Sequence, residues 1–203
     1  SIAICCLWSF LDPKHEKRIK SLVQNYSKEV YVTCSAELVP KWGEYERTTA
    51  VALNAYIGPV TVGYITRLDQ KLSEMGYTRP LQISQCAGGT ISVSKAIEAP
   101  LLTLDSGPVS GVTGSIRLGS EMNLSNIITT DLGGTSFDVG VIHDLNPTVS
   151  YRSLVHQYEY FLPKVDVQTL GTGGGSKIKI DALTKSLQVG PDSAGASPGP
   201  VCY

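Results

Sequence analysis

A turn of two glycines between two short strands is the feature that most constrains the fold of this chain. Two runs rich in β-branched residues, 126–132 and 136–143, are separated only by Gly133-Gly134-Thr135, and this pattern predicts a β-hairpin. Glycines let the main chain approach a bound group closely, and successive N–H groups at such a turn can hold an anion. The hairpin is therefore a candidate binding site.

Two aspartates, Asp131 and Asp138, flank this turn. Their carboxylates would repel a phosphate unless a divalent cation stood between them, and magnesium in nucleotide sites usually keeps several of its waters. Thr135 and Ser136 add hydroxyl donors. The pattern predicts a site for a magnesium-bound nucleotide. Its simpler interpretation is an ordinary hairpin whose aspartates face solvent, and the residues alone leave both open.

A second glycine-rich segment runs from Leu170 to Lys177. It is not a P-loop, because that motif needs a glycine immediately before the lysine and Ser176 stands there. It is not a dinucleotide fingerprint either, because residues 178–180 favour a strand where that motif needs a helix. Gly173, Gly174 and Gly175 are therefore predicted to form a loop with almost no side chains. Such a loop suits a flat or anionic ligand, or tight packing.

The order of the remaining patterns predicts an α/β fold that becomes α+β toward the C-terminal end. We expect helices at 13–26, 45–75 and 106–121, and strands at 2–8, 30–34, 81–84, 101–104, near 177–180 and near 186–189, with further strands between 148 and 170. Pro59 should kink or break the long helix. Small residues at 110, 111, 114 and 115 leave room for a neighbouring backbone. A candidate boundary near residue 122 divides a βα-rich part, 1–121, from a hairpin-rich part, 122–203.

Composition argues against several classes of protein. With 17 basic and 18 acidic residues and a net charge of −1, nothing favours binding to nucleic acid or to a membrane surface. No apolar run reaches the roughly 18 residues that a membrane helix needs. The five cysteines lack C-x-x-C spacing and the three histidines lack metal-like spacing, so we expect free thiols and a cytoplasmic location. Arg47 is expected in a surface ion pair at an exposed helix start.

Both ends of the chain suggest a piece of a longer protein. The chain opens without methionine, inside an apolar stretch, and it stops within a turn-rich segment. Residues 192–200 are too rich in small side chains to build a core. We expect them to form a lid, or a loop held by a further part of the protein.

Eight short segments follow one another in a characteristic order along the whole chain. They are 8–16 (WSFLDPKHE), 44–48 (EYERT), 54–59 (NAYIGP), 88–89 (GG), 106–108 (SGP), 131–138 (DLGGTSFD), 171–176 (GTGGGS) and 190–203 (GPDSAGASPGPVCY). Each motif is moderately specific, and the ordered set is highly specific. Together they resemble the hydantoinase A/oxoprolinase family, which includes the related subunits of ATP-dependent acetone and acetophenone carboxylases.

The resemblance implies part of an actin-like, sugar-kinase-like ATPase fold, in which two lobes enclose the nucleotide. The chain carries only the second phosphate-binding motif of such a fold, so the first lobe is expected to be absent. ATP and Mg²⁺ are the implied cofactors. The match to the motif assigns phosphate binding to Gly133, Gly134, Thr135, Ser136 and Asp138, magnesium (through water) to Asp131, and a place near the nucleotide to Gly173, Gly174 and Gly175.

The implied activity is that of an ATP-dependent hydrolase that phosphorylates the carbonyl oxygen of a cyclic amide, after which water opens the ring. A small carbonyl substrate, a B-type partner subunit or domain, and an oligomer are implied with it, and the isolated piece is expected to be inactive. One alternative is a subunit of a ketone carboxylase. Phe137 slightly favours this alternative, because hydantoinases and oxoprolinases often have threonine at that position. Another is a non-catalytic lobe for subunit assembly. Cys86-Ala87, in place of a usual polar pair, and Thr172, in place of a common alanine, also depart from the family.

Overall fold

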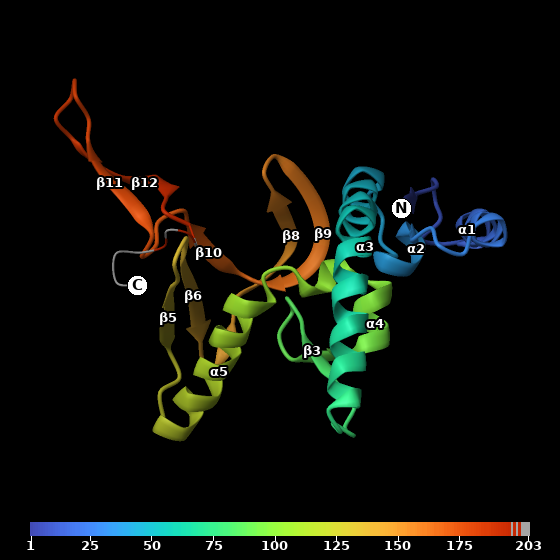
Figure 1. Cartoon of the computed structure of the whole chain (residues 1–203), viewed down its shortest axis with the longest axis horizontal. Coiled ribbons are helices and arrows are strands. Elements are labelled where there is room, and N and C mark those ends of the chain that lie inside the picture. The colour runs from blue at the N-terminus through green and yellow to red at the C-terminus, as the bar shows by residue number, and fades with distance from the viewer. Residues whose placement is uncertain (196, 198, 200–203) are drawn as a thin grey trace. The chain divides into compact units, whose positions relative to one another are not determined.

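The computed structural model describes residues 1–195, 197 and 199 (Figure 1). They fall into two compact units: unit 1 comprises Ser1–Ser106 and Val149–Val165, and unit 2 comprises Gly107–Thr148 and the described residues from Asp166 onward. The boundary expected near residue 122 lies inside unit 2, and its assignment to parts of a longer protein stays a prediction. The expected lid at 192–200 lies partly outside the described residues, and Cys202 lies wholly outside them.

Unit 1 opens with a two-stranded parallel sheet. Strand β1 (Ile2–Ile4) pairs with β2 (Val32–Cys34), and helix α1 (Lys14–Tyr26) connects them. Ile4, Val32 and Cys34 are buried and form a small core. The opening strand is shorter than predicted, because the chain leaves the sheet after Ile4 and exposes Leu7 and Trp8.

The long helix α3 (Glu44–Glu74) is the central element of unit 1. The sequence predicted a kink or a break at Pro59; the helix does not break there, because it runs through that residue. Proline removes one main-chain hydrogen bond, but packing of a buried helix face can outweigh that loss. The buried face of α3 includes Ala50, Val51 and Ile65.

The rest of unit 1 packs on α3 or on elements that contact it. It consists of α2 (Ser35–Leu38), the hairpin of β3 (Gln82–Ser84) and β4 (Thr90–Ser92), α4 (Val93–Glu98), the 3₁₀ helix η1 (Pro100–Thr103), and the antiparallel pair β8 (Val149–Val155) and β9 (Tyr158–Val165). The main core joins Ala50, Leu101, Tyr160 and Leu162.

The prediction of a strand at 101–104 was wrong. Proline opens a helical turn there, and the Leu101 N–H donates to the Asn54 side chain (2.9 Å) instead of to a strand.

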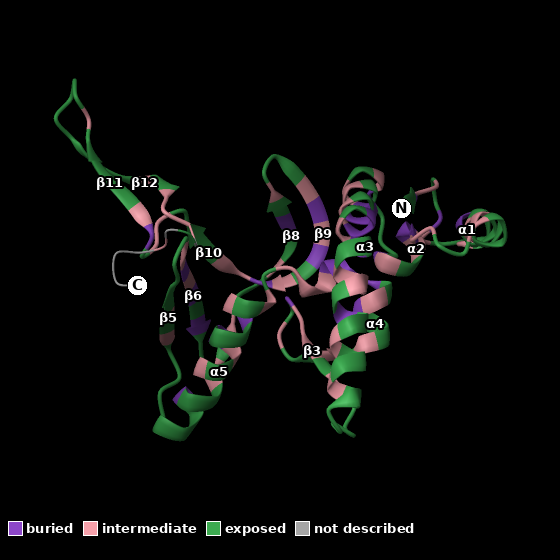
Figure 2. Ribbon diagram, in the orientation of Figure 1, coloured by how far each residue is buried: buried purple, intermediate pink, exposed green. Residues whose placement is uncertain are grey.

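Unit 2 contains helix α5 (Ser106–Met122) and a small antiparallel sheet. In that sheet β6 (Phe137–His143) lies between β5 (Ile127–Leu132) and β10 (Val167–Leu170), and the short β7 (Asn146–Pro147) also pairs with β6. A separate hairpin joins β11 (Ser176–Ile180) and β12 (Leu187–Ser193), and Figure 2 shows it exposed over most of its length. The predicted helix and the predicted strands of this region are confirmed.

Close packing in unit 2 does not use the glycines that were expected to provide it. A Cβ at Gly111 or Gly114 would meet nothing within 4 Å. The tight contacts lie at Gly119, where a Cβ would come within 2.3 Å of the Ile127 side chain, and at Gly140, where it would come within 2.6 Å of Val112. Helix α5 therefore packs on one face of the β5–β6 hairpin.

The cysteines Cys5, Cys6, Cys34 and Cys86 are free, as expected. Burial raises the pKa of Cys34 and of Cys86 to about 11, which favours the thiol form of both. Among the described residues, no helix combines the length and the apolar character that crossing a bilayer would need.

Candidate functional site

Three polar residues form one rung across the sheet of unit 2. Asp131 on β5 is the register partner of Asp138 on β6, and Asp138 is also the partner of Thr169 on β10. Side chains that are directly opposite on an antiparallel sheet point to the same face, with Cβ atoms about 4.5–5.5 Å apart. The hairpin therefore places both sequence-predicted aspartates side by side, and it adds Thr169, which the sequence analysis did not identify.

The two aspartates of this rung have different surroundings. Asp138 is only 8% exposed, and its two carboxylate oxygens accept hydroxyl protons from Thr169 Oγ1 (2.6 Å) and Ser136 Oγ (3.0 Å). Asp131 is exposed and receives no hydrogen bond from the described residues. One carboxylate is thus held by the protein, and the other is available to a ligand.

The turn between the strands presents main-chain donors. The Gly133 N–H closes the turn by donating to the Ser136 carbonyl (2.9 Å). Among the described residues, nothing accepts a hydrogen bond from the N–H groups of Gly134, Thr135 or Ser136, and the first two residues are exposed. Unpaired amides in succession at a glycine turn are the usual elements of an anion site.

The glycine loop predicted at 173–175 packs directly on this turn. The Gly174 N–H donates to the Gly133 carbonyl (2.9 Å), and the Gly175 N–H donates to the Gly134 carbonyl (2.6 Å). A Cβ at Gly173 would come within 2.7 Å of main-chain atoms of Gly133 and Thr135. The fold thus brings together the two glycine-rich segments that the sequence singled out, although some 40 residues separate them in the chain.

A cavity of about 370 Å³ lies on the aspartate side of the hairpin. It is lined by Asp131 and Asp138, by other residues of the three strands, and by Pro108, Gly111, Val112 and Ser115 of α5. Gly111 and Ser115, two of the four small residues of α5 that were expected to admit a neighbouring backbone, therefore line this space instead. It is large enough for a hydrated ion or a part of a small molecule.

The donor set of this site fits a magnesium ion bound mainly through water. Like charges directly opposite on a sheet destabilise it, yet no ion pair joins either aspartate to a lysine or arginine in the described part of the chain. Magnesium accepts one or two carboxylates and keeps several waters. Nowhere in the described residues do three or more histidine, cysteine or acidic side chains converge as a metal cluster.

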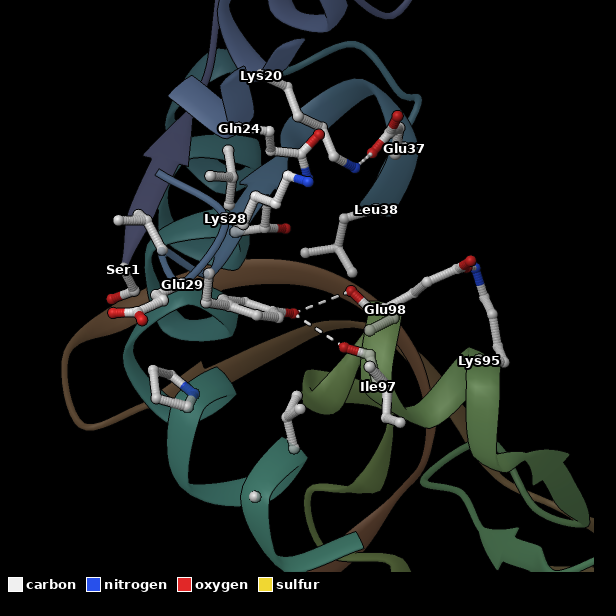
Figure 3. A pocket seen from close by; sticks show the side chains of 18 residues that line it. Ser1, Lys20, Gln24, Lys28, Glu29, Glu37, Leu38, Lys95, Ile97 and Glu98 are labelled. Atoms are coloured by element: carbon white, nitrogen blue, oxygen red, sulfur yellow. Dashed lines mark hydrogen bonds and ion pairs between the residues drawn. The ribbon is translucent and has the colours of Figure 1, made fainter. Parts of the chain in front are cut away.

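Unit 1 contains a larger cavity, of about 800 Å³, between α1, β2, α3 and α4 (Figure 3). Its charged groups are largely paired with one another: Lys20 with Glu37 at 2.6 Å, and Lys95 with Glu98 at 3.4 Å. The Tyr31 hydroxyl donates to the Glu98 carbonyl (3.0 Å), and burial raises the pKa of Tyr31 to about 12. Lys28 and Gln24 also line the cavity, and their side chains have no partner in the described part of the chain. The described lining contains no pair of adjacent glycine turns like that of unit 2, so volume alone does not make this cavity the stronger candidate.

A buried polar cluster in unit 1 was not predicted. Arg47 is fully buried, so the prediction that it forms a surface ion pair was wrong. Its Nη2 donates to the Cys6 carbonyl (2.6 Å) and to Ser9 Oγ (2.9 Å). Its guanidinium lies 5.3 Å from the centre of the Phe10 ring. Glu16, also fully buried, accepts hydrogen bonds from Ser9, Ser35, Cys6 and Ala36. Burial raises the pKa of Glu16, but these hydrogen bonds outweigh it and hold the pKa below its ordinary value.

Comparison with known proteins shows that the chain is similar to part of larger proteins. It is 37% identical over its whole length to caprolactamase subunit alpha of Pseudomonas jessenii and 34% identical to the acetophenone carboxylase gamma subunit of Aromatoleum aromaticum. It spans 29% and 28% of those proteins.

Solved structures agree with the sequence matches. The crystal structure of the ATP-dependent caprolactamase superposes with a TM-score of 0.80 at 37% identity, over 99% of this chain and 29% of that one. The nucleotide-free acetone carboxylase structure gives a TM-score of 0.77 at 31% identity, over 92% of this chain and 27% of that one. These matches confirm the expected mixed α/β fold. The family model described as hydantoinase/oxoprolinase matches residues 47–203, and the chain therefore belongs to the hydantoinase/oxoprolinase family.

Proposed function

We propose that this chain is part of an enzyme that uses Mg·ATP to activate the carbonyl of a cyclic amide for ring opening by water. The proposal rests on two features that lie side by side. One is an exposed glycine turn whose amides have no partner in the described part of the chain, and the other is a pair of adjacent carboxylates that no lysine or arginine neutralises there. The similarity to caprolactamase, which is named for its action on a cyclic amide, supports this substrate class.

The chemistry explains why such an enzyme would need ATP. Amide resonance makes direct attack by water slow, and ATP supplies the phosphoryl group that turns the carbonyl oxygen into a leaving group. The overall reaction consumes the amide, ATP and water and yields the opened amino acid, ADP and phosphate. In phosphoryl transfer the protein contributes mainly positioning and charge stabilisation.

The residues of unit 2 would divide these tasks. The amides of Gly134, Thr135 and Ser136, with the Thr135 hydroxyl, would bind phosphate oxygens, and Asp131 would hold magnesium through water. The loop Gly173–Gly175 would support the turn from behind through its two main-chain hydrogen bonds. Asp138 would act through the hydroxyl groups that it holds, because both of its oxygens already accept protons from side chains.

The whole protein would include more than this chain. Its matched relatives are more than three times longer, and several are named as subunits. We therefore include in the proposal an actin-like second lobe, a B-type partner subunit or domain, and an oligomeric enzyme that works in the cytoplasm.

A ketone carboxylase subunit is the second candidate. The observation that favours it is the similarity to acetophenone and acetone carboxylase subunits, at 34% and 33% identity over the whole chain. Phe137 also favours this candidate, because hydantoinases and oxoprolinases, which act on cyclic amides, often have threonine at that position. In this alternative the same phosphate site would use ATP to activate a ketone or bicarbonate.

The test uses the protein as its own gene encodes it, with any copurifying partner. Isothermal titration with Mg·ATP should show binding that Asp131→Ala weakens at least tenfold, while Glu121→Ala, which removes an exposed carboxylate of α5, leaves it unchanged. Binding that is unaffected by Asp131→Ala would refute the role of this residue in holding magnesium.

A second assay separates the branches. ADP release is measured with ε-caprolactam and 5-oxoproline, and with acetone and acetophenone in the presence of bicarbonate. Stimulation by the lactams supports the amide reaction, and stimulation by ketone plus bicarbonate supports the carboxylase. If the full-length protein binds no nucleotide at all, the remaining alternative is a non-catalytic lobe for subunit assembly.

A further inference from the structure

The hydroxyl of Ser136 has only one proton, and the fold already engages it. A serine hydroxyl has one donor and two acceptor lone pairs. Ser136 Oγ donates to Asp138 Oδ2 at 3.0 Å, and this carboxylate is a pure acceptor when ionised. Ser136 therefore presents lone pairs to any further partner, and these attract a cation but repel a phosphate oxygen.

The neighbouring hydroxyl is different. Thr135 is exposed, and its Oγ1 has no hydrogen-bond partner in the part of the chain that the structure describes. It is free to donate its proton. Two adjacent hydroxyls, which look equivalent in the sequence, are thus prepared for opposite kinds of ligand.

Thr169 maintains this arrangement from the other side of the carboxylate. Its Oγ1 donates to Asp138 Oδ1 at 2.6 Å, so each oxygen of Asp138 receives one hydroxyl proton. The register places Thr169 directly opposite Asp138 on β10. Without this hydrogen bond, a largely buried oxygen would lack a donor and the carboxylate could rotate away from Ser136.

We propose that Ser136 is a ligand of the divalent cation and not a phosphate donor, and that Thr169 is a positioning residue that acts on it through Asp138. This inference rests on the proposed nucleotide site and changes the role that the sequence assigned to Ser136. It identifies a protein oxygen that would bind the cation directly, while Asp131 holds the cation through water. Oxygen donors completed by several waters are a ligand set that Mg²⁺ and Mn²⁺ accept.

The first experiment compares nucleotide binding with and without metal. Dissociation constants for ADP are measured by calorimetry in EDTA and in Mn²⁺, on the full-length protein and its variants. Ser136→Ala should bind ADP like the wild type in EDTA and about tenfold more weakly in Mn²⁺. Equal weakening in both conditions would show that Ser136 donates to phosphate and would overturn the proposal.

The second experiment tests the positioning residue. Bound Mn²⁺ is measured by electron paramagnetic resonance in the presence of ADP. Thr169→Val should weaken Mn²⁺ binding roughly tenfold, because outer partners of metal ligands typically contribute 10–100-fold, and Thr169→Ser should restore it to within about threefold. The matched control is Thr148→Val, an exposed threonine of unit 2, which should change nothing.

A further variant and a set of controls distinguish failure of this inference from failure of the proposed function. Ser136→Cys should shift preference from Mg²⁺ toward the thiophilic Cd²⁺, a result that does not depend on the folding of the Thr169 variants. If Thr169→Val and Ser136→Ala both bind Mn²⁺ as the wild type does while ADP still binds, the further inference is wrong and the proposed function stands. If the wild type binds neither ADP nor Mn·ADP, both fail.

Discussion

Each unit of this molecule contains a polar cluster built around a carboxylate, and the two clusters are satisfied in opposite ways. In unit 1, Glu16 is fully buried and accepts four hydrogen bonds from the protein. In unit 2, Asp131 is exposed and accepts none from the described residues. The same kind of side chain therefore stabilises the fold in one place and stays available in the other.

The comparison gives a way to separate structural from functional polar groups. Buried polar groups are normally paired within the protein, so a carboxylate such as Glu16, whose two oxygens accept four hydrogen bonds, needs no ligand. Nε and Nη1 of the neighbouring Arg47 have no hydrogen-bond partner in the described part of the chain. Two like charges directly opposite on a sheet destabilise it, so the aspartate pair beside the unengaged amides of the turn indicates a site for a partner. The predictions below test whether the two clusters differ in this way.

The largest effect is expected in unit 1. Glu16→Ala would leave four buried or half-buried donors without their acceptor, and we expect a loss of roughly 3–5 kcal/mol in the free energy of unfolding. The measurement is urea denaturation of the full-length protein. Glu29→Ala, which removes an exposed glutamate from the same unit, should change it by less than about 0.5 kcal/mol. Similar losses in the free energy of unfolding for both variants would show that the buried Glu16 cluster does not stabilise the fold.

A large effect on binding is expected from Gly173→Ala. The new Cβ would lie within 2.7–2.8 Å of main-chain atoms of the phosphate turn, so the turn or the loop must move. We expect ADP affinity to fall at least tenfold and stability to fall by roughly 1–3 kcal/mol. Gly171→Ala is the control, since its Cβ would meet nothing within 4 Å. Unchanged ADP binding by Gly173→Ala would show that the turn is not the binding element.

A smaller effect should follow from Thr135→Val. The change removes a hydroxyl with no partner in the described part of the chain, so stability should stay within about 0.5 kcal/mol of the wild type. ADP affinity should fall roughly threefold to tenfold in both EDTA and Mn²⁺, because the lost hydrogen bond goes to phosphate. Calorimetry on the same samples as Ser136→Ala checks this. A loss confined to Mn²⁺ would assign the two hydroxyls the other way round.

The smallest effect concerns pH. The folded-state pKa of Glu16 is lowered, so the ionised carboxylate contributes stability above the ordinary glutamate pKa of about 4.3. That contribution is lost as pH falls toward and through the lower folded value. The advantage of the wild type over Glu16→Gln in urea midpoints should therefore be constant near neutrality and shrink below about pH 4. An advantage that grows on acidification would contradict the assignment.

The sequence predicted most of unit 2 and of its site, because the relevant signals are local. The hairpin around Gly133-Gly134 and the glycine loop at 173–175 can be read from a few adjacent residues. Thr169 could not be found in this way, since its role comes from a strand register that joins residues 31 positions apart.

Unit 1 was less predictable for a similar reason. Arg47 carries no local sign of burial, and only the arrangement of the segment around Ser9 encloses it. The 3₁₀ helix at Pro100–Thr103 was predicted to be a strand because three leucines within four residues, 101–104, do not specify a period. A long-range hydrogen bond from the Leu101 N–H to the Asn54 side chain stabilises the turn there.

The contact at Gly173 limits how this site can evolve. Even the smallest side chain does not fit there, so two distant stretches of main chain can change position only together. Mutations that adapt such an enzyme to a new compound are therefore expected among the side chains around this contact. The contact itself would be inherited unchanged.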